Sequence, residues 1–226
     1  MTVDLRDKVV VVTGASLGIG RATAFGFAAE GARLLLSYHE HEEDARAVAE
    51  RCDELGALEV VTAPLDLGDE GSVRAFAAAV LERFEGIDVL VNNAGIVVWR
   101  RFLEQEFDEI EAQIRVNLLG TLTLTRLLLP RVRDAVIDVV STASLHGSAT
   151  LAPYGASKWG LRGFTKALAK EHPELRLYNV HPAVTATRMN DFKGMDPARV
   201  AEVIVRVARG ELELEPGADV DLRDFT

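Results

Sequence analysis

Short apolar runs alternate with stretches of helical periodicity along nearly the whole of this 226-residue chain. The apolar runs are rich in valine, leucine and isoleucine, as is typical of strands that are buried on both faces of a parallel sheet. Strands that alternate with helices in this way form right-handed βαβ units, whose helices cover the faces of the sheet. The pattern therefore predicts an α/β fold with three layers around a doubly wound parallel sheet.

The boundaries of these elements follow from the periodicity and from the positions of glycine and proline. We expect strands over Lys8–Thr13, Arg33–Ser37, Glu59–Thr62, Ile87–Val91, Val136–Val140, Leu175–Val180 and, at the edge, Asp219–Leu222. We expect helices over Arg21–Glu30, Glu42–Leu55, Ser72–Phe84, Phe107–Leu129, Tyr154–Glu171 and Pro197–Arg209. No linker, repeat or change in composition marks a second domain, so we predict a single domain over residues 1–226.

Composition narrows the class of protein. The formal net charge is −10, from 25 basic and 35 acidic residues, and such a surface repels nucleic-acid backbones. The single cysteine, Cys52, can form neither an internal disulfide nor a thiolate metal site. No apolar run reaches the ~20 residues of a membrane span, and the N-terminus lacks an apolar signal core. We therefore expect a cytoplasmic protein with no metal, no nucleic-acid partner and no membrane association.

A glycine-rich turn, Gly14 to Gly20, connects the first expected strand with the first expected helix and has the spacing G-x-x-x-G-x-G. Ligands of open parallel sheets bind beyond the carboxyl ends of the strands, where this turn lies. Glycine lets a ligand reach backbone amides that a Cβ atom would shield. The following helix presents free N–H groups and a partial positive charge to phosphate oxygens. The turn therefore predicts a phosphate site, and a turn that serves only helix packing is the alternative.

Polar residues follow two other strands. Asn92 and Asn93, followed by Ala94 and Gly95, come after the fourth strand, where side-chain amides can tie neighbouring strand ends together. A plain polar turn is the alternative. Asp66 follows the third strand and is placed either to accept a hydrogen bond from an adenine amino group or to cap its own loop.

Tyr154 and Lys158 are four residues apart and therefore lie one turn apart on the same helix face. An ammonium near a phenol favours the phenolate and so lowers the phenol's pKa from its usual value of about 10. Such a tyrosine can give or take the proton of an alcohol oxygen while a hydride moves at the adjacent carbon. Ser141, at the end of the fifth strand, is placed to hold the same oxygen. An exposed tyrosine–lysine pair is the alternative.

Together these motifs resemble those of the short-chain dehydrogenase/reductase family, in its main NAD(P)-dependent branch. The matching residues are, in order, Thr13-Gly14-x-x-x-Gly18-x-Gly20, Asn92-Asn93-Ala94-Gly95, Asn117, Ser141 and Tyr154-x-x-x-Lys158. The resemblance runs from about Asp7 to Met189. It implies a Rossmann-like fold and an oxidoreductase that interconverts a ketone or aldehyde and an alcohol by hydride transfer with NAD or NADP.

The resemblance also implies a role for each matched residue. Tyr154 would be the general acid/base, Lys158 would hold the nicotinamide ribose and lower the pKa of Tyr154, and Ser141 would position the substrate oxygen. Asn117 would anchor the water of a proton relay. The implied cofactor contacts are Gly14, Ser16, Leu17, Gly18, Ile19, Gly20, Tyr38, His39, Asp66, Leu67, Asn93, Ala94, Gly95, Tyr154, Lys158, Pro182, Val184 and Thr187.

The chain departs from the family pattern at two places. Ala183 stands where the family often has glycine, and its methyl group would lie beside the nicotinamide. Ser144 stands at a common glycine position and offers a second hydroxyl, although we favour Ser141 for the catalytic role. His146 and His181 flank the expected site, and we interpret them as ordinary loop and strand-end histidines.

The end of the second strand bears on the choice of cofactor. An acidic residue there binds ribose hydroxyls and repels a 2′-phosphate, which favours NAD. Here Tyr38 takes that place, which favours NADP, whereas His39 and Leu17 stand where NADP users often carry basic residues. We favour NADP, with NAD as the alternative.

Apolar residues near the expected site suggest an apolar or mixed carbonyl or alcohol substrate: Ile96, Val97, Val98, Trp99, Leu151, Val184 and Phe192. The helices around Asn117 and Tyr154 carry further apolar residues, Leu122, Leu124, Leu127, Leu128, Trp159, Leu161 and Phe164, which suggest a homotetramer or homodimer. The alternative function is a catalytically silent NAD(P)-binding sensor or scaffold protein of the same fold.

Overall fold

The computed structural model describes residues 2–190 and 192–225, and it contains one seven-stranded sheet in the order β3-β2-β1-β4-β5-β6-β7. The strands are β1 (Val9–Val12), β2 (Arg33–Tyr38), β3 (Glu59–Pro64), β4 (Ile87–Asn92), β5 (Val132–Val139), β6 (Arg176–His181) and β7 (Asp219–Asp221). Every neighbouring pair is parallel. The predicted fold class, a doubly wound parallel sheet of the Rossmann-like kind, is confirmed.

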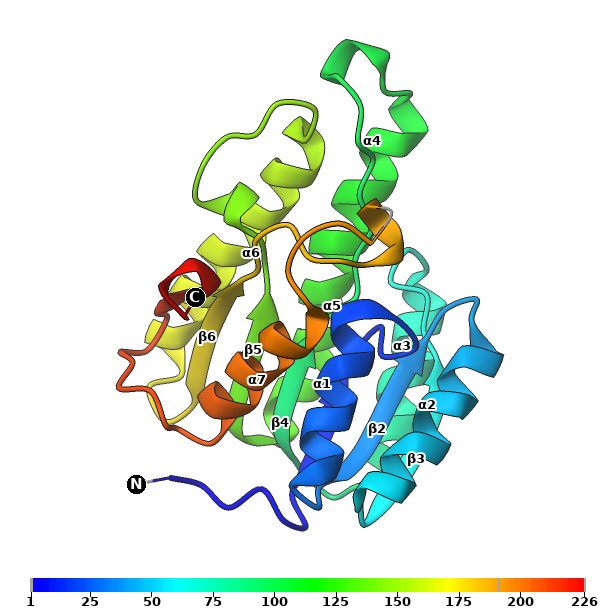
Figure 1. Cartoon of the computed structure of the whole chain (residues 1–226), viewed down its shortest axis with the longest axis vertical. Helices are drawn as coiled ribbons and strands as arrows, with labels where there is room; N and C mark the ends of the chain where they lie inside the picture. The colour runs from blue at the N-terminus through cyan, green and yellow to red at the C-terminus, as the bar shows by residue number, and fades with distance from the viewer. Residues whose placement is uncertain (1, 191, 226) are drawn as a thin grey trace.

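Helices cover both faces of this sheet (Figure 1). They are α1 (Gly18–Ala29), α2 (Glu42–Leu55), α3 (Glu70–Arg83), α4 (Phe107–Ile114), α5 (Thr121–Leu128), α6 (Ala152–Glu171) and α7 (Pro197–Ala208). Helices α1, α2 and α7 contribute to the core on one face, and α3, α5 and α6 contribute to the core on the other.

Strand β1 shows why such a sheet needs continuous apolar runs. Val10 and Val12 join the core that contains Phe27, whereas Val9 and Val11 join the opposite core, since side chains alternate between the faces of a strand. Each buried valine contributes about 1.5 kcal/mol or more through removal of its apolar surface from water. A polar residue at any of these positions would therefore weaken one of the two cores.

Most boundaries lie within two residues of the prediction, and the larger differences are in α1, in β5 and in the helix expected over Phe107–Leu129. Helix α1 begins at Gly18 rather than at Arg21, and β5 begins at Val132 rather than at Val136. The start of β5 contains Arg133 and Asp134, which interrupt the apolar run. The expected helix over Phe107–Leu129 is divided by a π-helical segment, Arg115–Gly120, between α4 and α5.

Strand order reverses at β1, which pairs with β2 on one side and with β4 on the other. Ligands of open parallel sheets bind at this point, beyond the carboxyl ends of the strands. In Figure 1 these ends point toward the end of the molecule where α4 and the segment between β6 and α7 project. The loops at that end are therefore the expected place of a ligand site.

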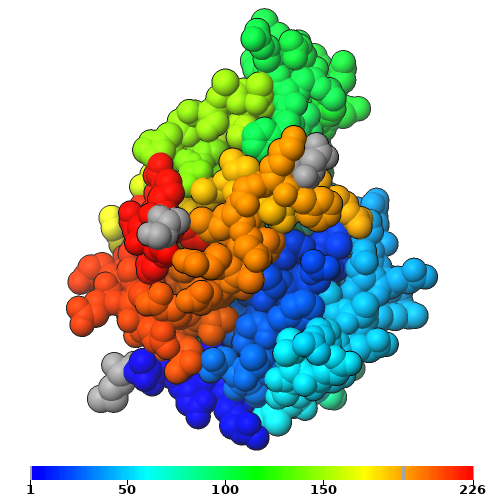
Figure 2. All heavy atoms as spheres, in the orientation of Figure 1, coloured from blue at the N-terminus to red at the C-terminus, as the bar shows by residue number. Residues whose placement is uncertain are grey.

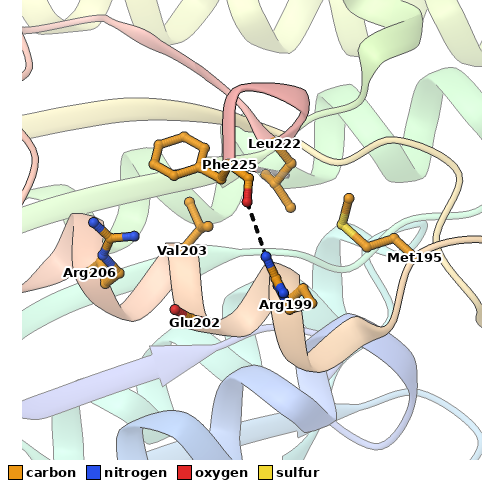
Figure 3. Close-up of a pocket in the computed structure, with 7 residues that line it drawn as sticks. All are labelled: Met195, Arg199, Glu202, Val203, Arg206, Leu222 and Phe225. Carbon is orange, nitrogen blue, oxygen red and sulfur yellow. Dashed lines mark hydrogen bonds between the residues drawn. The ribbon is translucent and has the colours of Figure 1, made fainter.

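The C-terminal residues complete the sheet and cover α7. The expected edge strand is present as β7, and the turn Leu222–Phe225 follows it. This turn and α7 enclose a small cavity of about 350 Å³, in which an Arg199 guanidinium N–H donates to the Phe225 carbonyl oxygen at 3.1 Å (Figure 3). Among the described residues, no helix is both long enough and apolar enough to cross a membrane.

Candidate active site

A cavity of about 740 Å³ lies beyond the carboxyl ends of the central strands. It extends from the β1–α1 turn to the first turns of α6, so it joins motifs that are far apart in the sequence. The predicted site residues that line it are Gly14, Ser16, Leu17, Gly18, Ile19, His39, Asp66, Leu67, Asn93, Ala94, Gly95, Ser141, Tyr154, Lys158, Pro182, Val184 and Thr187. The other three predicted residues, Gly20, Tyr38 and Asn117, do not line it.

The β1–α1 turn is built for close approach to its backbone. Gly14 and Gly18 have φ values of +65° and +55°, a region that favours glycine. A Cβ atom on Gly14 would lie 2.9 Å from the Cα atom of Ala94. Gly18 and Ile19, the first residues of α1, line the cavity, so the helix N-terminus with its free N–H groups lies where a dinucleotide's phosphates would bind. The turn therefore fits the cofactor that the motif predicts.

Gly20 has a role in packing. A Cβ atom at this position would collide with the carbonyl oxygen of Gly14, so Gly20 allows α1 to pack against its own turn. Gly20 does not line the cavity, and its contact with the cofactor stays a prediction. For this one glycine, the alternative of a packing role holds.

Asn92, the last residue of β4, and Asn93, which follows it, tie strand ends together, as predicted. The Asn92 amide donates to Asp138 Oδ1 at 2.7 Å and thereby joins β4 to β5. The Asn93 amide donates to the carbonyl oxygen of Thr13 at 2.9 Å and joins β4 to the end of β1. These bonds hold Ala94 and Gly95 at the cavity wall.

Tyr154 and Ser141 meet inside the cavity. Burial raises the pKa of the Tyr154 phenol, and a hydrogen bond with the Ser141 side chain lowers it in part. Lys158 Nζ lies 5.9 Å from the centre of the Tyr154 ring and donates to the carbonyl oxygen of Val139 at 2.9 Å. The expectation of a lowered pKa for Tyr154 is therefore not met in this structure, because the desolvation of the phenol outweighs the hydrogen bond with Ser141.

Lys158 is itself buried deep in the cavity wall. Burial lowers the pKa of its ammonium to about 8, against the opposing charge of Asp138, which raises it. Burial raises the pKa of Asp138, while hydrogen bonds from Thr165 and Asn92 lower it. The cavity thus contains a lysine whose charged form is disfavoured by burial and supported by Asp138.

The structure separates the two candidate serines. Ser144 is fully buried, donates to the carbonyl oxygen of Ser141 at 2.6 Å, and lies 3.1 Å from His181 Nδ1. Ser141 lines the cavity beside Tyr154, and Ser144 does not. His181 is a buried residue at the end of β6, and His146 lies at the surface 3.1 Å from Arg223. Neither histidine lines the cavity.

Asn117 lies in the π-helical segment, behind the cavity wall. Its Oδ1 atom accepts from the Ile96 backbone N–H at 2.7 Å, and its amide donates to the Ile96 carbonyl oxygen at 2.8 Å and to Ser157 Oγ at 3.2 Å. These bonds fix the backbone beside Gly95. Its part in a proton relay stays a prediction.

The far end of the cavity lies beside the end of β2. Asp66 caps its own loop, since its Oδ1 atom accepts from the Gly68 N–H at 2.7 Å. It also lines the cavity, and its contact with an adenine amino group stays a prediction. His39 Nε2 lies 3.5 Å from Asp66 Oδ2. Tyr38, which was predicted to contact the cofactor, does not line the cavity, and its carbonyl oxygen accepts from the Leu65 N–H. Tyr38 ends β2 just before the loop that reaches the cavity, and its contact with the cofactor stays a prediction.

Several lining residues carry no sequence signal of their own. They include Glu40, His41, Ser148, Ala149, Arg188 and Met189. Arg188 directly follows the predicted Thr187, which is the one clue to its position. It comes close to the β2–α2 loop only through the fold, across 147 residues of sequence.

Comparisons with known proteins agree with these motifs. The family model described as short chain dehydrogenase matches residues 8–197. "Dehydrogenase/reductase SDR family member 7" of Mus musculus is 39% identical over 189 residues, which cover 79% of this chain and 56% of that protein. The 3-oxoacyl-(acyl-carrier-protein) reductase of Synechocystis is 33% identical over 199 residues, which cover 85% of this chain and 80% of that protein.

Solved structures share the whole architecture. A short chain dehydrogenase from Burkholderia cenocepacia, crystallised in complex with NADP, is 28% identical, has a TM-score of 0.90, and matches over 97% of both chains. The mouse relative is longer, so the chain spans little more than half of it. Fold, motif order and family model together lead to one conclusion: the chain belongs to the short chain dehydrogenase family of oxidoreductases.

Proposed function

We propose that this protein interconverts a ketone or aldehyde and an alcohol by hydride transfer with NADP(H) or NAD(H). The observation that carries the proposal is that Ser141, Tyr154 and Lys158 line the same cavity as the glycine turn from Gly14 to Ile19. The bound nicotinamide would supply or accept the hydride. The protein's own residues would bind the substrate oxygen and move its proton.

Tyr154 would exchange a proton with the substrate oxygen. Because burial raises its pKa, the phenol is protonated at neutral pH in the free protein and is ready to donate to a carbonyl oxygen. Ser141 would hold the same oxygen by a hydrogen bond. The Lys158 ammonium, one helix turn beyond Tyr154, would bind the ribose hydroxyls and favour the phenolate that forms as the proton leaves.

We favour NADP(H) over NAD(H) because position 38 holds tyrosine rather than an acidic residue that would repel a 2′-phosphate. The Burkholderia cenocepacia structure, which is similar over its full length, was solved with NADP. Initial rates measured with NADPH and NADH test the preference. A hundredfold preference for NADH would overturn it.

The wall near Tyr154 favours an apolar or mixed substrate. Ile96, Val97, Trp99, Leu151 and Val184 line it, whereas two residues expected there, Val98 and Phe192, do not. One relative is a 3-oxoacyl-(acyl-carrier-protein) reductase, so we expect the substrate's carbonyl to carry an apolar substituent rather than a sugar phosphate.

The test is cofactor-dependent turnover of a panel of ketones, aldehydes and alcohols by the protein and its Tyr154→Phe variant. We expect the variant to lose on the order of 10²–10⁴-fold in rate, the usual contribution of a general acid or base. Tyr178→Phe is the matched control, because Tyr178 is a buried tyrosine of β6 outside the cavity. Full activity in Tyr154→Phe would contradict the mechanism. Cofactor binding without turnover of any compound would favour the silent sensor or scaffold.

A further inference from the structure

The segment between β6 and α7 folds over the glycine turn. Its base is closed by hydrogen bonds from the Ala186 N–H to the Met195 carbonyl oxygen at 2.8 Å and from the Met195 N–H to the Val184 carbonyl oxygen at 2.9 Å. Thr187 packs so closely on the turn that a Cβ atom at Gly18 would lie 3.0 Å from its methyl group. In Figure 2 this segment, in orange, lies against the blue N-terminal part of the chain.

This packing carries Arg188 across the cavity to the loop that follows β2. Arg188 Nη1 lies 3.5 Å from His41 Nε2, and both residues line the cavity together with His39. The cavity's lysine, Lys158, lies at the opposite end, in α6. Among the described residues that line the cavity, Arg188 is therefore the one arginine or lysine side chain at the β2 end.

The charges around this end are mixed, and Arg188 decides their balance. His39 faces Asp66 at 3.5 Å, and His41 Nδ1 faces Asp44 at 3.9 Å, so each imidazole has a carboxylate beside it. Glu40 also lines the cavity and would repel an anion. A guanidinium carries a permanent charge and a planar fork of N–H donors that matches phosphate oxygens. Without it, this end would be net acidic.

We propose that Arg188, with His41 beside it, forms the binding site for the 2′-phosphate of NADP(H). The inference deepens the proposed function and rests on it. It assigns the choice of cofactor to a residue that is remote in sequence from the glycine turn and from β2. The Arg188 guanidinium and the His41 ring lie side by side at the β2 end of the cavity, next to His39 in the loop that follows Tyr38.

The test uses two ligands that differ only in the phosphate at issue: adenosine 2′,5′-bisphosphate and 5′-AMP. Their affinities are measured by isothermal titration calorimetry for the protein, for Arg188→Ala and for Arg188→Lys. Arg46→Ala is the matched control, because Arg46 is an exposed arginine of α2 paired with Glu42 and its loss changes the net charge equally. Thermal unfolding midpoints confirm that each variant is folded.

We expect the protein to bind the bisphosphate more tightly than 5′-AMP, and Arg188→Ala to weaken the bisphosphate by on the order of tenfold to a hundredfold, as for the loss of a charge-assisted hydrogen bond. Binding of 5′-AMP should stay within about twofold, because 5′-AMP lacks the 2′-phosphate that Arg188 would bind and the Arg188 side chain is exposed. Arg188→Lys should fall between, and Arg46→Ala should match the parent.

Equal weakening of both ligands would overturn the inference and place Arg188 on the 5′-phosphate instead. Unchanged affinity for both, or a parent protein that does not distinguish the ligands, would also overturn it. Neither ligand carries a nicotinamide, so the result is independent of turnover. Failure of the hydride-transfer proposal would leave this discrimination intact, whereas failure of the inference would leave turnover intact and remove the discrimination.

Discussion

His181 Nε2 lies 3.0 Å from Asp219 Oδ1, and this contact joins the last residue of β6 to the first residue of β7. On its other side, His181 Nδ1 lies 3.1 Å from the carbonyl oxygen of Ser141. Arg162 donates to both carboxylate oxygens of Asp219, at 3.0 and 2.7 Å. A short edge strand near the C-terminus is thereby connected to the backbone of the serine that lines the active site.

Asp219→Asn should destabilise the protein at neutral pH. Hydrogen bonds from Arg162, Lys166 and His181 hold the pKa of Asp219 well below its usual range, despite the opposing effect of burial. The folded-state pKa is lower than the unfolded one, so the carboxylate stabilises the fold above about pH 4 and this contribution is lost as pH falls below it. We expect a loss of about 1–3 kcal/mol at pH 7, as for hydrogen bonds to a charged group.

Urea unfolding at pH 7 and pH 3 measures this effect. The difference between the protein and Asp219→Asn should shrink at the lower pH, where the carboxylate becomes protonated in the unfolded chain. Asp224→Asn, at an exposed position of the same C-terminal segment, is the control and should change little. Equal stability of the protein and Asp219→Asn at pH 7 would contradict the role of this contact.

Lys158 should make the protein more stable as pH rises from about 8 toward 10. Burial lowers its pKa to about 8, so between this value and the unfolded pKa of about 10.4 the unfolded chain binds more protons than the folded one. Stability rises with pH in that window, by up to about 3 kcal/mol in total. Lys158→Met should abolish the rise, and chemical unfolding at pH 7, 8, 9 and 10 measures it. A parent protein whose stability falls steadily over this range would disprove the prediction.

The fold was predictable because its signal is local, whereas several site contacts are not. Val9 to Val12 can be recognised as a strand buried on both faces from its own composition. The start of β5 was missed because Arg133 and Asp134 interrupt the apolar pattern, and Asp134 is in fact paired with Arg176 of the neighbouring strand. That pairing depends on a strand order that local periodicity does not contain.

The candidate site likewise contains residues that the sequence predicts and contacts that depend on the fold. Motif residues such as Gly14, Ser141 and Tyr154 lie where strands end, so their convergence follows from the parallel sheet. The approach of Arg188 to His41 requires the path of the β6–α7 segment, which has no repeating pattern. The raised pKa of Tyr154 could not be predicted from the sequence, because it depends on how deeply the phenol is buried. The spacing of Tyr154 and Lys158 indicates only that a lysine lies nearby.

Gly20→Ala and Gly163→Ala should have opposite effects on stability. A Cβ atom at Gly20 would collide with the carbonyl oxygen of Gly14. Alanine at position 20 must therefore displace the turn, which lowers the stability of the protein and weakens dinucleotide binding. Gly163 lies on the exposed side of α6 with no atom within 4 Å of its Cβ position, so alanine should stabilise the helix by about 1 kcal/mol. Thermal unfolding and cofactor titration of both variants test this. Normal cofactor binding in Gly20→Ala would show that the turn tolerates the methyl group.

The exposed apolar side chains around α4 and α6 predict self-association. Three of the seven residues expected to form an interface, Leu124, Leu128 and Leu161, are instead buried within the chain's own core. Exposed apolar residues remain in this region: Leu103 at 94%, Phe107 at 89%, Leu119 at 57% and Trp159 at 46%. An apolar surface of this kind is typical of an interface between proteins.

We therefore expect light scattering at micromolar concentration to give at least twice the chain mass of 24.6 kDa, as for a homodimer or homotetramer. Leu119→Asp should shift the protein toward the monomer, because an unpaired carboxylate would be buried at the interface. Leu58→Asp is the control, since Leu58 is 49% exposed beside β3, across the sheet from these helices. A monomeric parent protein, or equal effects of the two substitutions, would remove the case for an interface on this face.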